Sequence, residues 1–207
     1  MFREIAKKSP FLRRQVRNYR QRRNQPSWEA LLGKDRNLWD SALKEAEKGQ
    51  RILVATSVGA HLAGTTLESL LSVALTLRGA QVHILLCDAA LPACLACSSD
   101  IYPNHSKFSK EGPIKDCRAC YEPALKMYKS LGLTVHKYSD FISDFEKKKA
   151  EEISSTIPFT EIEHYSLDGM AVGEHAMAGA LRFFARGILD GEPYGEAVNM
   201  AFRLESL

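Results

Sequence analysis

Four cysteines form the strongest chemical pattern in this chain of 207 residues. They are arranged as two Cys-x-x-Cys pairs, Cys94 with Cys97 and Cys117 with Cys120, and 19 residues separate the pairs. A Cys-x-x-Cys turn places two thiolates on one side of a tight loop, each about 2.3 Å from a shared metal ion. Two such turns complete a tetrahedron, and this spacing is typical of zinc sites. The sequence therefore predicts one structural zinc ion held by these four cysteines.

The same four thiolates are compatible with other chemistry. An iron–sulfur cluster is the minority alternative to zinc, and a redox dithiol or a set of inert buried cysteines are two more. A catalytic zinc is disfavoured because four cysteines leave no open coordination position. The fifth cysteine, Cys87, ends an apolar run and is expected to be a core thiol.

A second group of candidate residues follows the first apolar run. It comprises five residues of a small-residue stretch, Ser57, Gly59, His61, Gly64 and Thr65. Ligands of parallel sheets bind beyond the carboxyl ends of the strands, and backbone N–H groups at a helix N-terminus suit an anion. We therefore predict that this loop binds ligand and that His61 is a catalytic base. The alternative is a tight strand-to-helix turn without a ligand.

Glu174 and His175 stand at the start of a long apolar helical pattern over 173–189. Both are predicted to contact the ligand from a helix start. The alternative is that Glu174 only complements the helix dipole.

The elements that must position these residues alternate between strand and helix. Strands are expected at 51–56, 81–87 and 134–138, and helices at about 66–77 and 121–131. The core face of the first helix is expected to comprise Leu67, Leu70, Leu71, Ala74 and Leu75. Strand–helix–strand units predict right-handed crossovers and a parallel sheet. The fold class is therefore α/β, a Rossmann-like parallel sheet flanked by helices, with the cysteine pairs in an insertion at about 88–120.

The chain is expected to divide into a basic helical arm at 1–49 and the α/β domain at 50–207, which ends in helices. Residues 1–26 carry nine Lys or Arg against one acidic residue, so their net charge is +8 and that of the remainder is −5. No long apolar run or secretory signal is present, which favours a cytoplasmic protein. Since the last helical pattern has no capping signal, we expect a fragment with a missing C-terminal domain.

Three roles are open to the arm at 1–26. A basic helix of this kind suits peripheral contact with the anionic inner membrane. Specific nucleic-acid binding is disfavoured because the arginines are not interleaved with aromatic residues and no known motif is present. The third role is a solvated leader.

Several segments together resemble the N-terminal region of bacterial surface or capsule polysaccharide biosynthesis proteins, which are glycosyltransferase-like. They are Ile52–His61, Leu75–Asp88, Leu91–Cys97, Cys117–Cys120 and Gly173–Ala176. The resemblance covers about residues 50–190 and extends to the N-terminal half of GT-B glycosyltransferases, in which two Rossmann-like domains face each other. It implies that this half holds the sugar acceptor and that a second half, lacking here, holds the nucleotide-sugar.

Two functions follow from these expectations. The first is a glycosyltransferase-like protein of surface polysaccharide biosynthesis, or the N-terminal half of one, with the 57–65 loop lining the acceptor cleft. The alternative is a non-catalytic, zinc-stabilised binding or scaffold module that its basic arm docks to a membrane or a partner.

Overall fold

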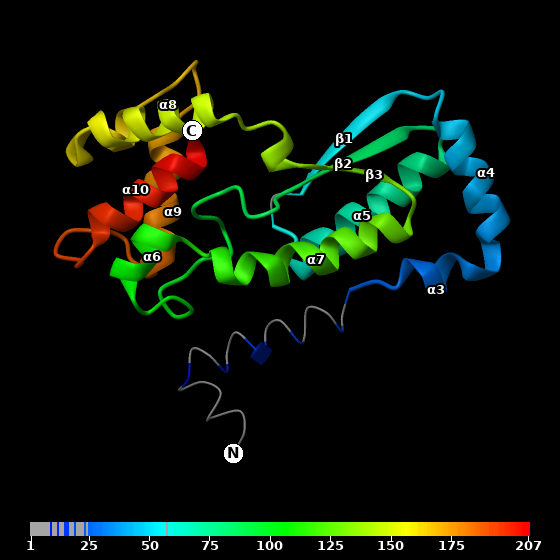
Figure 1. The fold of residues 1–207 in the computed structure, drawn as a ribbon, viewed down its shortest axis with the longest axis horizontal. Coiled ribbons are helices and arrows are strands. Elements are labelled where there is room, and N and C mark those ends of the chain that lie inside the picture. Colours follow the sequence, from blue (N-terminus) through cyan, green and yellow to red (C-terminus); the bar gives the residue numbers. More distant parts are fainter. Residues whose placement is uncertain are drawn as a thin grey trace. The chain divides into compact units, whose positions relative to one another are not determined.

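The computed structural model describes residues 25–56 and 58–207, together with Ser9, Leu12, Gln15, Val16, Tyr19 and Arg23. Ser57 and most of the basic residues of the arm lie outside the described residues, so the predictions made for them stay predictions. The chain forms two compact units (Figure 1). We call Arg17–Asp88 with Cys117–Phe141 the sheet unit. Met1–Val16, Ala89–Asp116 and Ile142–Leu207 form the helical unit.

The sheet unit is built on three parallel strands in the order β1-β2-β3. They are β1 (Arg51–Thr56), β2 (Gln81–Leu86) and β3 (Thr134–Lys137). Val54 aligns with Ile84, and Ile84 aligns with Val135. Alternate residues of β2 are buried, as expected for a sheet with one face packed on helices. The predicted α/β class, with a parallel sheet flanked by helices, is confirmed.

Four helices accompany these strands in the described part of the sheet unit. They are α3 (Trp28–Leu32), α4 (Arg36–Ala46), α5 (Leu62–Leu77) and α7 (Ile114–Ser130), with short 3-10 turns at Gly33–Asp35 and Tyr138–Asp140. Val73 of α5 and Met127 of α7 pack into one core with Ile84 of β2. Trp39 of α4 is buried there as well, and its Nε1 donates to the carbonyl of Leu131 at 3.0 Å.

Helix α5 buries the opposite face to the one predicted. Its large side chains point outward and are 49–68% exposed, namely Leu67, Leu70, Leu71 and Leu77. Its buried residues are instead mostly hydroxylic, namely Thr65, Ser69, Ser72 and Thr76. Ser72 Oγ, for example, donates to the carbonyl of Glu68 at 2.7 Å, so its burial leaves the hydroxyl satisfied. The predicted core face was therefore wrong except for Leu75, which packs against the core.

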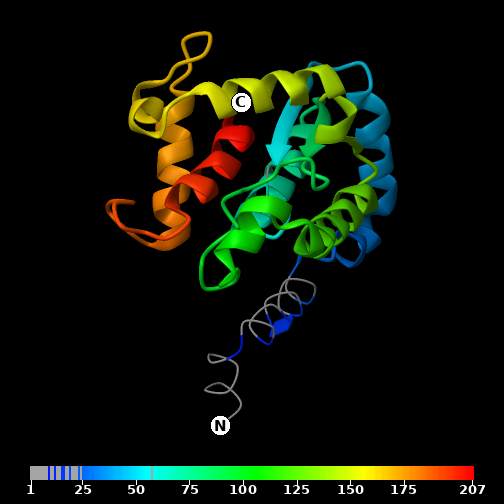
Figure 2. The same ribbon diagram turned by 60° about the vertical axis from the view of Figure 1, so that its left-hand side comes forward.

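The helical unit contains helices α6, α8, α9 and α10 within its described residues. Their bounds are α6 (His105–Glu111), α8 (Asp144–Thr156), α9 (Val172–Phe184) and α10 (Gly195–Ser206), and a 3-10 segment covers Phe159–His164. Helices α9 and α10 run side by side (orange and red in Figure 2). Gly179 permits this approach, because a Cβ there would lie 2.4 Å from the Phe202 ring. None of the helices described has the length and apolar character needed to cross a bilayer.

Candidate functional site

The first cysteine pair lies in the loop of the helical unit that precedes α6. The N–H of Cys97 donates to the carbonyl of Cys94 at 3.0 Å, so the pair forms the tight turn that its spacing predicts. The two Sγ atoms are 3.8 Å apart. Two thiolates bound at about 2.3 Å to one tetrahedral metal are separated by about 3.8 Å. The pair therefore has the geometry that a tetrahedral metal requires of two of its ligands.

Arg182 of α9 fastens this turn. Its Nη1 donates to the carbonyls of Leu95 and Cys97 at 2.7 and 3.0 Å, and its Nη2 donates to the carbonyl of Cys94 at 3.0 Å. A second tether follows the turn, where the N–H of Ser99 donates to the carbonyl of Phe183 at 2.8 Å. The loop that carries the first pair is thus bound to α9 through its backbone.

The second pair has a different setting, because Cys117 and Cys120 lie on α7. Residues three apart on a helix share a face, so this pair is presented by a helix and not by the second tight turn that was predicted. The helix begins at Ile114, ahead of the expected start near residue 121. The N–H of Ala60 donates to Cys120 Sγ at 3.1 Å, which connects this sulfur to the loop between β1 and α5.

Among residues 25–56 and 58–207, the side chains of His, Cys, Asp and Glu form no group of three or more that could hold a metal. Cys94 and Cys97 belong to the helical unit, whereas Cys117 and Cys120 belong to the sheet unit. The four-cysteine zinc site stays a prediction, and each unit supports it only through the geometry of its own pair.

The loop between β1 and α5 has packing reasons for its small residues. Gly59 is buried, and a Cβ there would lie 2.7 Å from the carbonyl oxygen of Cys120 and 2.8 Å from Ala124 Cβ. A Cβ on Gly64 would lie 2.7 Å from Nδ1 of His61. Thr65 is buried, and its Oγ1 donates to the carbonyls of His61 and Leu62. The ligand-binding role predicted for these residues is not tested by their contacts.

His61 is the exposed residue of this loop that carries chemistry. It is the N-cap of α5, its carbonyl accepts the N–H of Thr65 at 2.9 Å, and its ring lies over Gly64. His61 is therefore an exposed imidazole at the N-terminal end of α5, and its predicted role as a base stays a prediction.

Polar groups follow the other two strands at the same edge of the sheet, and sequence reasoning missed them. Asp88, two residues after β2, accepts the N–H of Ser139 at 3.2 Å and its Oγ–H at 2.6 Å. Tyr121 lies nearby on α7, and burial together with the carboxylates of Asp88 and Asp140 raises the pKa of its hydroxyl. The position of Asp88 directly after an apolar strand is the signal that would have found it.

A partly buried hydrogen-bond cluster lies at the end of β1. Thr56 Oγ1 donates to Glu68 Oε2 at 2.7 Å, and the Tyr128 hydroxyl donates to the same oxygen at 3.3 Å. Burial raises the pKa of Tyr128 far above its ordinary value, so its hydroxyl stays protonated and remains a donor. This cluster fixes the end of the strand from which the loop departs.

Glu174 and His175 lie in the first turn of α9, both exposed, in the helical unit. Gly173 before them is buried and a Cβ there would collide with the carbonyl oxygen of Ile162. They were predicted to contact the same ligand as the β1–α5 loop, which belongs to the other unit. That contact stays a prediction.

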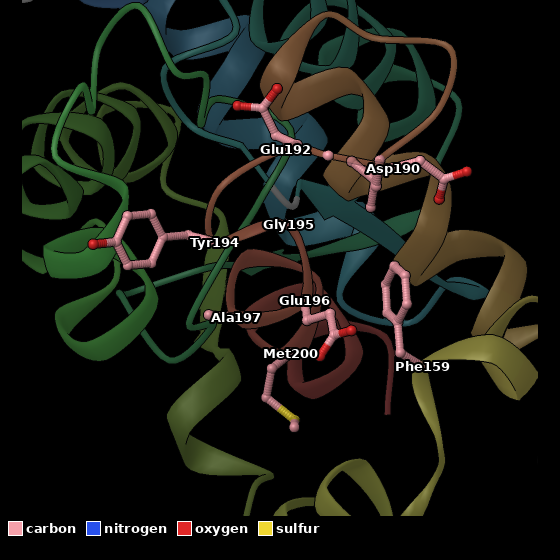
Figure 3. Close-up of a pocket in the computed structure, with 10 residues that line it drawn as sticks. Phe159, Asp190, Glu192, Tyr194, Gly195, Glu196, Ala197 and Met200 are labelled. Atoms are coloured by element: carbon pink, nitrogen blue, oxygen red, sulfur yellow. The ribbon is translucent and has the colours of Figure 1, made fainter.

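A cavity of about 720 Å³ lies in the helical unit beside α10. Aromatic and acidic side chains line it, including Phe159, Asp190, Glu192, Tyr194 and Glu196 (Figure 3). None of the predicted site residues lines this cavity.

No protein-family model, curated protein or solved structure matches this chain. The resemblance to polysaccharide biosynthesis proteins therefore stays a prediction from the sequence.

Proposed function

We propose that this chain is a glycosyltransferase-like protein of surface polysaccharide biosynthesis that binds a sugar acceptor as one half of a GT-B-type enzyme. Two consecutive parallel strand–helix units in the order β1-β2-β3 support a Rossmann-like, mononucleotide-binding half. The observation that carries the proposal is the set of polar groups beyond all three strands. His61 follows β1, Asp88 follows β2 and Ser139 follows β3.

In the proposed reaction, His61 removes the proton of an acceptor hydroxyl as its oxygen attacks the anomeric carbon of a donor sugar. The bond between that carbon and the nucleotide diphosphate breaks, and the diphosphate leaves with the bonding electrons. Asp88 is already fixed by two hydrogen bonds from Ser139, so it is positioned to accept further hydroxyl groups of a sugar. In a GT-B-type enzyme the donor would be held by a second Rossmann-like half.

The four cysteines are proposed to hold a structural zinc ion, with an iron–sulfur cluster as the minority alternative. The Sγ separation of the first pair and the helical presentation of the second suit thiolate ligands of one tetrahedral metal. The metal would then stabilise the cysteine-bearing segment and take no part in sugar transfer. We further propose that the protein acts at the cytoplasmic face of the inner membrane, with residues 1–26 in contact with anionic lipid.

The second candidate is a non-catalytic, zinc-stabilised binding or scaffold module. It is favoured by the contacts of Gly59, Gly64 and Thr65, each of which has a packing or hydrogen-bonding role in the turn without any ligand.

Histidine NMR of the full chain separates the two candidates. The chain has six histidines, whose ring resonances can be followed while short glycans and nucleotide-sugars are added. The enzyme proposal expects the His61 resonance to shift with glycan concentration, while exposed His164 of the helical unit serves as the unaffected control. His61→Ala assigns the resonance. If the His61 resonance did not shift at saturating glycan, the result would favour the non-catalytic binding module over the enzyme.

A further inference from the structure

Arg182 holds the first cysteine turn through its backbone, because one guanidinium donates to three carbonyls of the same four-residue segment. The carbonyls are those of Cys94, Leu95 and Cys97, and the donor–acceptor distances are 2.7–3.0 Å. Arginine is suited to this because its donors form a rigid planar fork. The residue stands 85 positions after Cys97 in the sequence, so the contact is made by the tertiary fold.

The turn is also seated in the core of the helical unit. Ala93 and Cys97 are buried in one cluster with Ala180 and Phe183 of α9. Helix α9 therefore holds this turn in two ways. Arg182 hydrogen-bonds to the backbone of the turn, and Cys97 is buried in the same cluster as Ala180 and Phe183. Together they restrict the turn to conformations like the observed one, in which the Cys94 and Cys97 Sγ atoms are 3.8 Å apart.

We infer that Arg182 is a positioning residue for the metal, which holds the Cys94–Cys97 turn in its metal-binding geometry before the metal arrives. The inference rests on the proposed zinc binding by the four cysteines. Because Arg182 is exposed, its charge contributes only weakly, and its effect comes chiefly from the three hydrogen bonds. Without these hydrogen bonds the turn has to become ordered when the metal binds. The free-energy cost of that ordering lowers the affinity for the metal.

The test uses the full chain, stripped of metal, with Co²⁺ as a spectroscopic probe and Zn²⁺ in competition with a chromophoric chelator. The sulfur-to-cobalt charge-transfer bands report the number of thiolate ligands. Arg182→Ala is expected to weaken Zn²⁺ binding by about 10–100-fold, the usual effect of losing an outer-shell partner. Arg182→Lys keeps the charge but not the fork, and is expected to restore only part of the affinity.

The matched control is Arg186→Ala, because Arg186 lies two residues beyond the end of the same helix and pairs with Glu192 instead of the turn. It should bind Zn²⁺ as the unaltered chain does. Circular dichroism of each metal-free variant checks folding separately from binding.

Unchanged Zn²⁺ affinity in a folded Arg182→Ala chain would overturn the inference. Where Arg182→Ala does not fold, Arg182→Lys decides in its place, and an affinity equal to that of the unaltered chain overturns it. An unaltered chain that binds neither Co²⁺ nor Zn²⁺ through its thiolates would overturn the zinc proposal itself, which is a different outcome from normal binding that ignores Arg182.

Discussion

The two cysteine pairs share one sequence pattern but are built in two different ways. Cys94 and Cys97 sit in a loop whose backbone is held by the guanidinium of Arg182. Cys117 and Cys120 sit on α7, where helical spacing alone puts them on one face. The first pair therefore depends on a long-range contact for its geometry, whereas the second depends on the integrity and seating of a helix.

This difference predicts which changes affect each pair. The first pair should respond to the residues that hold its loop, and the second to the core residues under α7 and to the loop at Gly59 that packs against it. Substitutions at each pair and in its surroundings therefore test that division.

Replacing any one of the four cysteines with serine is expected to abolish stoichiometric zinc. Structural zinc contributes about 10–16 kcal/mol in small zinc domains at neutral pH, so its loss outweighs any single packing change. Elemental analysis of protein purified without added metal measures it, and Cys87→Ser is the matched control that should keep one zinc per chain. Zinc retained in Cys120→Ser but lost in Cys97→Ser would place the metal on the first pair alone. Brown protein that contains iron would show that the cysteines hold an iron–sulfur cluster and not zinc.

The next largest effect is expected from weakening the core that packs against α7. Leu131 directly follows α7 and is fully buried, so Leu131→Ala is expected to destabilise the chain by about 2–5 kcal/mol. Leu70→Ala, on the exposed face of α5, should change stability by less than about 0.5 kcal/mol. Urea unfolding measures both. Equal losses in the two variants would mean that the α5 leucines are covered in solution.

The contrast on α5 also marks where sequence reasoning ends. The strands were predictable because β-branched and apolar runs are bounded by turn residues, and Gly79 and Gly132 adopt the positive φ expected after the helices. The orientation of α5 was not predictable, since the helix has leucines on one side and small hydroxylic residues on the other. The usual rule selects the leucines for the core, but small residues permit closer packing, and only the tertiary structure decides between them.

The candidate site shows the same limit. The spacing of Cys94 and Cys97 predicted a turn because the two residues are close in sequence. The same spacing is equally compatible with one turn of a helix, and Cys117 and Cys120 adopt that alternative. Arg182 could not be found at all, because nothing local in the sequence links α9 to the loop.

The β1–α5 loop packs against the helix of the second pair, and disturbing this contact is expected to have a smaller effect. Gly59→Ala is expected to destabilise the chain by about 1–3 kcal/mol, because its Cβ would lie 2.7 Å from the carbonyl oxygen of Cys120. Gly33→Ala meets open space and is the matched control, with no loss expected. Urea unfolding at neutral pH measures both, and Zn²⁺ affinity should fall only in Gly59→Ala. A loss of affinity in both variants would contradict the local character of the second pair.

The smallest effect expected is a dependence of stability on pH that arises in the sheet unit alone. Nδ1 of His83 on β2 and Nε2 of His136 on β3 are 2.9 Å apart, with one nitrogen donating and the other accepting. Burial, then the charges of His136 and Arg51, lower the pKa of His83 below its ordinary value of 6.5. The unfolded chain therefore takes up its proton at a higher pH than the folded chain does. Stability is complete above about pH 6.5 and decreases as the pH falls through that value.

Metal-free protein isolates this effect, because thiolate ligands also take up protons as the pH falls. Urea unfolding at several pH values between 7.5 and 5.5 should show stability falling with pH in the unaltered chain, and a smaller slope in His83→Gln. His164→Gln, which changes an exposed residue of the helical unit, should keep the full slope. If His83→Gln kept that slope as well, the pH dependence would have to arise outside the histidine pair, and the acid sensitivity assigned to the sheet unit would be wrong.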